Sequence, residues 1–433
     1  MKKCLLVTIL LLVLSMLTTG CQQHANNPVP STVPKSSSSS PTQVPSSTNT
    51  AVTQPNTVVL GGDHSNWISR QDQSGAMSCT GYYYLTKDGF LYFADRKSGT
   101  SIRLCSNVAC LHEDEPDPMV REECEAFIGG TSLTPMLFYD DHLYYILEDG
   151  YGTHLWQRNA VGMEEKKITS LGKEYTDKQY SILPFYYAIS GGYLYYDASV
   201  NGMEELEPNV FQATDEGYYI GQIHLATGKE RILCYSKTEA YTLLACREEG
   251  VLIFTTKIPD AEYGTEEHEE QVQNNSHQLQ YYDCGSGEIS LLFDKPAKEF
   301  NAPTTLIGSK VIYYNQDRNS SCYYYDLTDG SCGTFNEGAL VKLTDRYVIH
   351  TDRKTNARSV LDLETGTSLP YDMSSPVRVE DNTGDYLVLS YAKKESNGDR
   401  FRHYLFVELN TLSDGLQLTD GLEFYTLAYD RIS

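Results

Sequence analysis

Short runs of alternating apolar and polar residues recur along most of the chain and are separated by turn residues. One recurring element is a Gly, Asp or Ser followed by alternating apolar residues, as in GYLYY from Gly192 and DYLVL from Asp385. A second is a turn in which a small polar residue precedes glycine, as in DLTDG from Asp326 and DLETG from Asp362. Period-two alternation between closely spaced turns predicts β-strands joined by hairpins, and hardly any stretch has helical spacing.

The two elements occur together in seven copies, which follow one another at intervals of roughly 35–65 residues, a spacing typical of repeat architectures. The first elements begin at Gly81, Asp141, Gly192, Gly250, Ser309, Asp345 and Asp385. Seven copies of about four short strands each predict an all-β fold, a seven-bladed β-propeller over residues 57–433. A β-sandwich and an open β-solenoid are the alternatives that the pattern leaves open.

Closure of the ring has a candidate at the C-terminus. Six copies carry a strand-like stretch before their first element, whereas the copy at Gly81 has no good one. The chain ends in GLEFYTLAYD, so we expect residues 422–429 to supply the innermost strand of blade one. A strand added from the far end of the chain would hold the termini together and remove an open sheet edge.

Long insertions interrupt the repeat at residues 106–132, 197–217, 257–277 and 392–401. In a four-stranded blade, the loops between the second and third strands lie on the same face of the ring as the loops between blades. All four insertions fall in these two loop types, so we expect one elaborated face and one plain face. Binding residues often lie on loops held by a rigid scaffold, which makes the elaborated face the predicted functional surface.

The N-terminus predicts export. Two lysines precede an apolar run from Leu5 to Leu14, which is short for a membrane span and typical of a secretory leader. The LTTGC that ends at Cys21 resembles the lipobox of bacterial lipoproteins, although Thr18 stands where that family prefers leucine. The resemblance implies a leader over 1–20, lipidation of Cys21 and a place on the extracytoplasmic face of the cell membrane. Residues 21–56, rich in Ser and Pro, are expected to be a disordered tether.

The repeated LYY strand and D-x-x-T-G turn resemble those of TolB-like and YWTD-type propellers. Together with the lipobox, the tether and an LC-x4-C-x-H insertion, they resemble uncharacterised propeller lipoproteins of Gram-positive anaerobes. This resemblance implies the fold and the membrane anchor for roughly residues 57–433. It brings no catalytic residues, so catalytic residues stay unknown.

The excess of acidic residues limits the classes of partner that the protein can bind. The chain has 34 basic and 58 acidic residues, and loss of Lys2 and Lys3 with the leader leaves a net charge of −26. So acidic a protein should be repelled by nucleic acid and by anionic lipid, and nucleic-acid binding is excluded. Cations or basic partners are favoured, and we expect a monomer that binds a protein or a glycan.

The stretch RLCSNVACLHEDEPDPMVREECEAF, residues 103–127, contains Cys105, Cys110, His112 and Cys124. Three thiolates and an imidazole suit tetrahedral zinc. An exported chain can also form disulfides, and Cys110–Cys124 or Cys105–Cys124 would then be the natural pair. Free thiols are the third interpretation. Nine cysteines remain beyond Cys21, so at least one is unpaired within the chain.

Two acidic segments are candidate cation sites. DASVNGMEELE has the D-x-S-x-N-G opening of a calcium loop, which nominates as ligands Asp197, Ser199, Asn201 and Glu205. Pro208 stands where such a loop places a bidentate glutamate, and a solvated acidic turn is the alternative. The stretch 262–277 gathers glutamates around His268 and is expected to be a flexible solvated loop.

No nucleophile elbow, metalloprotease helix motif or phosphate-binding loop occurs. The sequence therefore favours a binding or scaffolding propeller that acts through its loop-rich face. One alternative is a polysaccharide hydrolase or lyase on the same fold, with carboxylates and His112 or His268 near the central channel. Another is a divalent-cation-binding surface protein.

Overall fold

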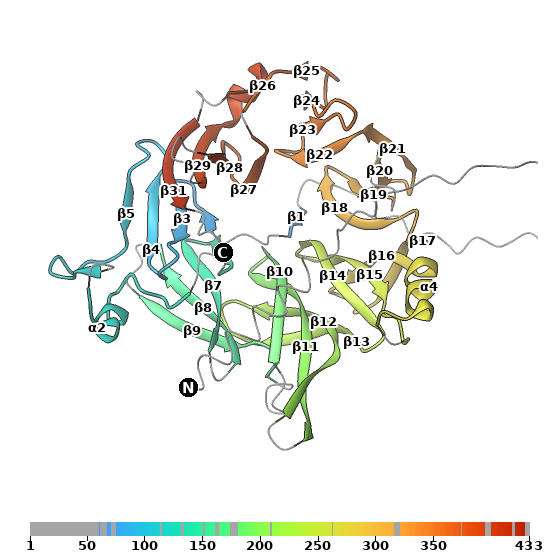
Figure 1. The fold of residues 1–433 in the computed structure, drawn as a ribbon, viewed down its shortest axis with the longest axis horizontal. Coiled ribbons are helices and arrows are strands. Elements are labelled where there is room, and N and C mark those ends of the chain that lie inside the picture. Colours follow the sequence, from blue (N-terminus) through green and yellow to red (C-terminus); the bar gives the residue numbers. More distant parts are fainter. Residues whose placement is uncertain are drawn as a thin grey trace, which may run out of the picture. The chain divides into compact units, whose positions relative to one another are not determined.

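The repeated segments form antiparallel sheets arranged as a seven-bladed β-propeller in the computed structural model (Figure 1). The structure describes residue 60 and residues 67–428, except 71–74, 113–114, 131–133, 150–151, 161–163, 174–180, 208–209, 262, 316–320, 374, 395–399 and 418–420. The predicted leader, Cys21 and the tether lie outside the described residues. Among the described residues, no helix is long and apolar enough to cross a membrane.

The repeat supplies four strands to each blade, and these follow one another from the innermost to the outermost. The first three blades are β2 (Gly75–Met77), β3 (Gly81–Leu85), β4 (Leu91–Asp95) and β5 (Ser101–Arg103); β6 (Met136–Tyr139), β7 (His142–Asp149), β8 (Gly152–Asn159) and β9 (Glu165–Ser170); β10 (Ser181–Ser190), β11 (Tyr193–Glu207), β12 (Val210–His224) and β13 (Glu230–Ser236). Blades four and five are β14 (Glu239–Arg247), β15 (Gly250–Lys257), β16 (Ser276–Asp283) and β17 (Ile289–Pro296); β18 (Asn301–Ile307), β19 (Lys310–Tyr314), β20 (Ser321–Asp326) and β21 (Cys332–Glu337).

The last two blades are β22 (Ala339–Lys342), β23 (Tyr347–Thr351), β24 (Arg358–Asp362) and β25 (Ser368–Leu369); β27 (Val377–Asn382), β28 (Tyr386–Lys394), β29 (Arg400–Glu408) and β31 (Gly421–Ala428). Between them, β26 (Tyr371–Asp372) pairs in parallel with β30 (Leu416–Gln417), which follows a 3-10 helix, η2 (Leu409–Asp414). The all-β, seven-bladed prediction is confirmed, and the second element of each repeat is the turn between the third and fourth strands.

The apolar positions of the repeat meet between blades. In the described part of the chain, each of the seven junctions between neighbouring blades has its own cluster of buried apolar side chains. Many tyrosines pack in these clusters. Those that are fully buried are Tyr82, Tyr145, Tyr195, Tyr196, Tyr219 and Tyr325. The core of this protein is therefore a ring of seven interfaces. Each interface is filled by side chains from the facing surfaces of two neighbouring sheets.

The predicted closure of the ring is wrong in its pairing. Strand β31 pairs with β29 and forms the outermost strand of blade seven, not the innermost strand of blade one. Blade one has its own innermost strand, β2, which pairs with β3. β2 lies so close to its neighbour that a Cβ on Gly75 would be 2.0 Å from the Tyr82 hydroxyl. Blades seven and one meet through side chains, and the Met77 amide donates to the Asp381 carboxylate at 2.7 Å.

The N-terminal segment joins the ring far from blade one. Strand β1 (Ile68–Ser69) pairs with β14 and adds a fifth strand to blade four (Figure 1). Trp67 is buried, with its ring edge-on to Tyr281 at 6.2 Å and the Arg247 guanidinium 4.7 Å from its centroid. The chain thus contacts blade four before it begins the first blade, an arrangement that the repeat pattern did not predict.

Candidate functional site

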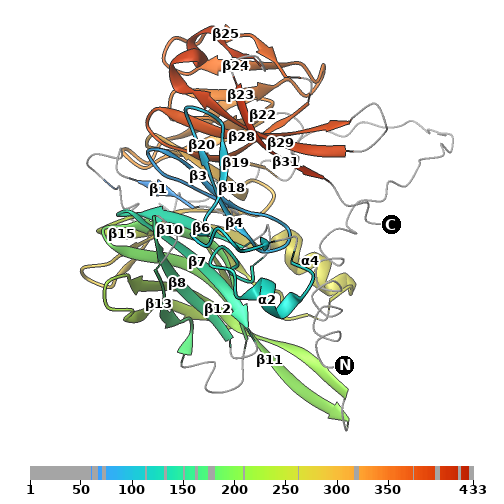
Figure 2. The ribbon, with the colours of Figure 1, turned by 90° about the vertical axis from the view of Figure 1, so that its left-hand side faces the viewer.

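The predicted elaborated face is present. The insertions after β5, between β11 and β12, between β15 and β16, and between β28 and β29 all belong to the two loop types of one face. Figure 2 shows helix α2 (Pro118–Glu122), helix α4 (Glu266–Asn274) and the long β11–β12 hairpin projecting in the same direction. We call this side of the ring, which carries residues 106–132, 197–217, 257–277 and 392–401, the loop-bearing face.

The insertion between blades one and two is held at both ends on the β3–β4 turn. At its start, the Leu104 amide donates to the Leu91 carbonyl at 3.1 Å. At its end, the Ala126 carbonyl accepts from the Leu91 amide at 2.8 Å, and Ile128 donates to Gly89 at 3.0 Å. The chain between these anchors therefore leaves the blade and returns to the same place.

This return brings together all four residues that the sequence nominated. One ligand atom from each of Cys105, Cys110, His112 and Cys124 lies within 4.8 Å of every other. His112 Nδ1 is 3.3 Å from Cys124 Sγ. The His112 backbone is in the left-handed region, with φ of 58°, which reverses the chain just after Cys110.

Local hydrogen bonds position the thiols. The Asn107 side chain accepts from the Ala109 amide at 3.0 Å and its carbonyl accepts from the Cys110 amide at 3.2 Å, which forms the turn that carries Cys110. The Glu125 carboxylate accepts from the amide and hydroxyl of Ser106 at 2.7 and 2.6 Å. Because Ser106 follows Cys105 and Glu125 follows Cys124, this contact ties the two cysteines together across the insertion.

Helix α2 delivers the last cysteine. The Asp117 side chain caps the helix by accepting from the Met119 amide at 2.9 Å. The Cys124 amide then donates to the carbonyl of Arg121, in the last turn, at 3.1 Å. Cys124 is buried against Phe90 and Ala126, so the short helix ends where blade one's apolar side chains begin.

The cluster places one buried and two partly buried thiols near a buried cation. Burial raises the pKa of the Cys124 thiol to about 12, and the thiols of Cys110 and Cys105 add to the rise. Arg158, on β8 of the next blade, is only 4% exposed, and this burial lowers the pKa of its guanidinium. Cys124 and Glu125 are close enough to Arg158 to offset part of that effect.

All nine described cysteines are free thiols, so neither predicted disulfide is present. The four side chains instead offer a set of donor atoms that could bind a metal ion. Three sulfur donors and one imidazole, all supplied by one insertion, could complete the coordination of one ion and leave no open position. A closed site of this kind supports structure and does not activate a substrate or a water.

The outer part of the insertion exposes apolar side chains. Val108 is 103% exposed, Met119 78%, Leu111 55% and Val120 48%. Helix α2 itself buries none of its residues. Solvent-exposed apolar side chains gathered on one segment are a feature of contact surfaces.

The predicted calcium loop is not a turn. Asp197, Ser199 and Asn201 lie in β11, where they share one face of the strand, and the backbone stays extended through Gly202. The Asp197 carboxylate is buried and accepts from the amides of Tyr186 and Leu243 at 2.9 and 2.8 Å. Burial raises the pKa of Asp197 to about 7. This carboxylate therefore joins blades three and four, whereas the fourth nominated ligand, Glu205, belongs to the same strand with its side chain outside the described set.

The acidic segment around His268 is also ordered differently from the prediction. Residues 266–274 form helix α4, whereas a flexible loop was expected. The Thr265 hydroxyl caps the helix by accepting from the His268 amide at 3.2 Å, and glutamates occupy the first turn. Carboxylates at a helix N-terminus are stabilised by the backbone dipole, which explains why so charged a segment is helical.

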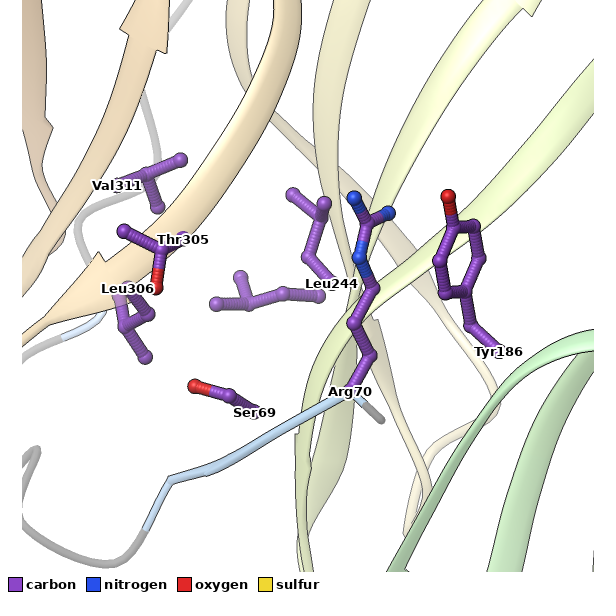
Figure 3. Close-up of a pocket in the computed structure, with 8 residues that line it drawn as sticks. Ser69, Arg70, Tyr186, Leu244, Thr305, Leu306 and Val311 are labelled. Carbon is purple, nitrogen blue, oxygen red and sulfur yellow. The ribbon is translucent and has the colours of Figure 1, made fainter. Parts of the chain in front are cut away.

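Cavities near the ring axis are lined by innermost strands and by the N-terminal segment. One of about 180 Å³ lies beside Arg70, whose guanidinium lies over the Tyr186 ring at 3.9 Å and donates to the Leu243 carbonyl (Figure 3). A larger one of about 830 Å³ is lined by β1, β22 and β27 together with neighbouring turns. Neither cavity is lined by His112 or His268, the two histidines of the enzymatic alternative.

Sequence reasoning found the four clustered residues and missed the groups around them. Arg158 lies in a different blade, 34 residues after Cys124, and no motif links the two positions. Nothing in the sequence distinguishes Glu125 from the neighbouring acidic residues, so its contact with Ser106 was not predictable. The N-terminal strand was indicated only weakly in the sequence, by the adjacent apolar residues Trp67 and Ile68 ahead of the repeat.

Comparison with known proteins adds no family. No family model matches, and no curated protein matches. Solved structures to which the chain is similar include TolB from Acinetobacter baumannii, at 14% identity and a TM-score of 0.33, with 71% of this chain and 63% of TolB covered. An oligogalacturonate lyase in complex with manganese is 10% identical with a TM-score of 0.27 over 63% of this chain and 81% of the lyase. An acylaminoacyl peptidase from Pyrococcus horikoshii is 10% identical with a TM-score of 0.39 over 67% of this chain and 52% of the peptidase.

The chain thus spans less than two thirds of TolB. At these identities and scores the comparisons assign neither family nor activity, and the propeller fold rests on the sheet topology.

Proposed function

We propose that this protein is an extracytoplasmic binding propeller, anchored to the membrane by a lipid on Cys21, that docks a protein partner on its loop-bearing face. The observation that carries the proposal is the placement of all four insertions on one face, with exposed apolar side chains at the end of the first. Most described connections of the plain face are short turns; the longest, between β29 and β31, carries η2 and β30. Elaboration concentrated on one side is what a docking surface on a rigid scaffold requires.

The chemistry of the partner follows from the surface. Val108, Leu111, Met119 and Val120 offer an apolar contact, and α4 adds glutamates on the same face. The net charge of the mature chain attracts basic groups and repels nucleic acid and anionic lipid. The partner is therefore a protein that presents apolar side chains within a basic surround.

Site-specific photo-crosslinking in the native host tests this proposal. A photoreactive residue is placed at Val108 or Met119 on the loop-bearing face, and at Thr365, exposed in a turn of the plain face, as the control. We expect one crosslinked partner from both loop positions and none from Thr365. Binding of that purified partner should then weaken at least about tenfold with V108S/M119S, as for loss of central apolar contacts.

Crosslinking from Thr365 to the same partner, or unchanged binding by V108S/M119S, would overturn the docking face. Turnover of a wall or dietary glycan by the purified protein would replace the binding function with the enzymatic one. The anchor is tested separately, because C21S should move the protein from the membrane fraction to the soluble extracytoplasmic fraction. Retention of C21S in the membrane would refute the lipid anchor and leave the docking face standing.

A further inference from the structure

We propose that Cys105, Cys110, His112 and Cys124 bind one zinc ion as a closed structural site, and that Arg158 balances the charge of the occupied site. The proposal does not depend on the proposed function, since it concerns how the first insertion is held. It rests on the geometry of the four ligand atoms, their chemistry and the burial of Arg158.

The geometry fits a single ion. Tetrahedral zinc with ligands at roughly 2.3 Å for sulfur and 2.0–2.1 Å for nitrogen has edges of roughly 3.6–3.8 Å between ligand atoms. The four ligand atoms lie within 4.8 Å of one another, and the His112 Nδ1 to Cys124 Sγ edge is 3.3 Å. Shortening the longest separations by up to about 1 Å and lengthening the His112–Cys124 edge by about 0.3 Å would therefore close the set around one ion.

The donor types select the metal. Thiolates with one imidazole in a tetrahedral arrangement are typical of zinc, whereas calcium and magnesium require oxygen ligands. A disulfide between any two of the thiols would use two of the four groups and leave a thiol and an imidazole together without a role. Zinc uses all four.

Arg158 supplies an independent reason. Its side chain is 5% exposed, its Nη2 is 3.6 Å from the Glu165 carboxylate, and its Nε and Nη1 have no hydrogen-bond partner among the described residues. A buried guanidinium in which two nitrogens lack hydrogen-bond partners is costly unless negative charge lies nearby. Zinc with three thiolates carries one net negative charge, next to the cysteine that already interacts with Arg158. Occupation of the site thus adds to the counter-charge that Glu125 and Glu165 give the buried cation, as outer groups do around other metal centres.

The consequence is local. Helix α2 buries no residue, and the apolar contacts of the insertion are those of the cysteines with Phe90, Ala126 and their neighbours. Zinc replaces the core that this segment lacks, and its loss should release residues 106–123 while the ring stays folded. Structural zinc acts in this way in small domains that have little apolar surface to bury.

The test is metal analysis of the full-length protein purified in detergent without oxygen. We expect one zinc per chain in wild type and in the controls C79S and C332S, whose thiols are exposed and outside the cluster. C110S and C124S should lose the zinc, and circular dichroism should show their ring still folded. R158Q should weaken zinc binding about 10- to 100-fold in a chelator competition, with partial recovery in R158K, because outer groups tune affinity by that amount.

Cobalt exchange gives a second readout that does not need a variant to fold. Cobalt in the wild-type protein should show the visible absorption of a tetrahedral thiolate site, and chelation should make three further thiols reactive and expose residues 106–123 to protease. Absence of stoichiometric metal after reconstitution with zinc, an intact mass lower by two hydrogens, or a bound iron–sulfur chromophore would each overturn the zinc site. Unchanged zinc affinity in R158Q would overturn the role of Arg158 alone.

Discussion

The junction between blades seven and one is held by aromatic side chains, and Phe424 is the most informative place to weaken it. Phe424 lies on β31, the last strand of blade seven, and is half-buried. Its ring centroid is 4.4 Å from that of Phe406 in its own blade and 5.8 Å from that of Tyr82 in blade one. The Ser101 hydroxyl of blade one also donates to the Phe424 carbonyl at 3.0 Å.

The expected loss can be worked from this geometry. Truncation of a fully buried Phe to Ala costs about 3–5 kcal/mol, so a half-buried ring should account for about 2 kcal/mol in Phe424→Ala. An aromatic pair adds about 0.5–1.5 kcal/mol beyond area, so the edge-on pair with Tyr82 should couple by about 1 kcal/mol. This coupling crosses the junction and therefore measures how strongly the ring is closed.

Urea unfolding followed by circular dichroism supplies the numbers. Tyr82→Leu, Phe424→Leu and their double variant form one cycle, and Phe406→Leu with Phe424→Leu forms a matched cycle within blade seven. Leucine keeps most of the volume, so that each single change removes the ring contact with little new cavity. Coupling near zero across the junction, together with about 1 kcal/mol inside blade seven, would refute closure through these side chains.

Three further results are expected. Trp67→Ala should detach β1 from blade four, which limited proteolysis within residues 60–74 would detect while circular dichroism of the ring stays unchanged; equal protection in wild type and variant would contradict this. Burial raises the pKa of Asp381 to about 7, so its folded form keeps a proton that the unfolded chain releases near pH 4, and wild type loses stability between these values. The melting temperature of Asp381→Asn relative to wild type should therefore rise from about pH 4 to about pH 7 and then level off, and a flat difference would contradict the shift. The Arg346 guanidinium lowers the pKa of Asp362 to about 2, so the stability from this pair is complete above about pH 4 and lost as pH falls toward 2; Arg346→Met should lack that acid-side loss in melting curves.

The sequence predicted the strands because each blade repeats a local rule. Alternation places one face of every strand in a junction, and the Asp-to-Gly turn is closed locally. In DLETG, the Gly366 amide donates to the Asp362 carbonyl at 2.8 Å with φ of 70° at the glycine. Such rules act within about ten residues, so a single sequence contains them in full.

Elements set by distant contacts were not predictable in the same way. Strand β2 is three residues long, GAM, and has no alternation to detect; it is a strand because Tyr82 and Met77 pack in the junction with blade seven. The C-terminal strand has clear alternation, but alternation does not say which edge it joins. Pairing with β29 buries Phe424 against both Phe406 and Tyr82, so it completes blade seven and still contacts blade one.

The residues expected to form a calcium loop form a strand instead, and the reason is geometric. The spacing D-x-S-x-N places three polar groups on one side of a calcium loop, and the same spacing places them on one face of a β-strand. In the structure the strand continues from Tyr193 to Glu207, and Asp197 accepts backbone hydrogen bonds from two neighbouring strands. The sequence of helix α4, by contrast, contains a helix N-cap pattern, Thr265 followed by glutamates. The high charge of the segment nevertheless favoured the prediction of a flexible loop.

The cysteine cluster shows what kind of site a sequence can nominate. All four candidate ligand residues lie within 20 positions of one another, so their types and their spacing were visible together. What separates a zinc site from a disulfide is the distance between every pair of ligand atoms and the charge around them. Both depend on the return of the insertion to Leu91 and on a guanidinium from the neighbouring blade. The candidate ligands are thus local in sequence, whereas part of the charge around them comes from the neighbouring blade, and removal of Arg158 is the change that separates the two contributions.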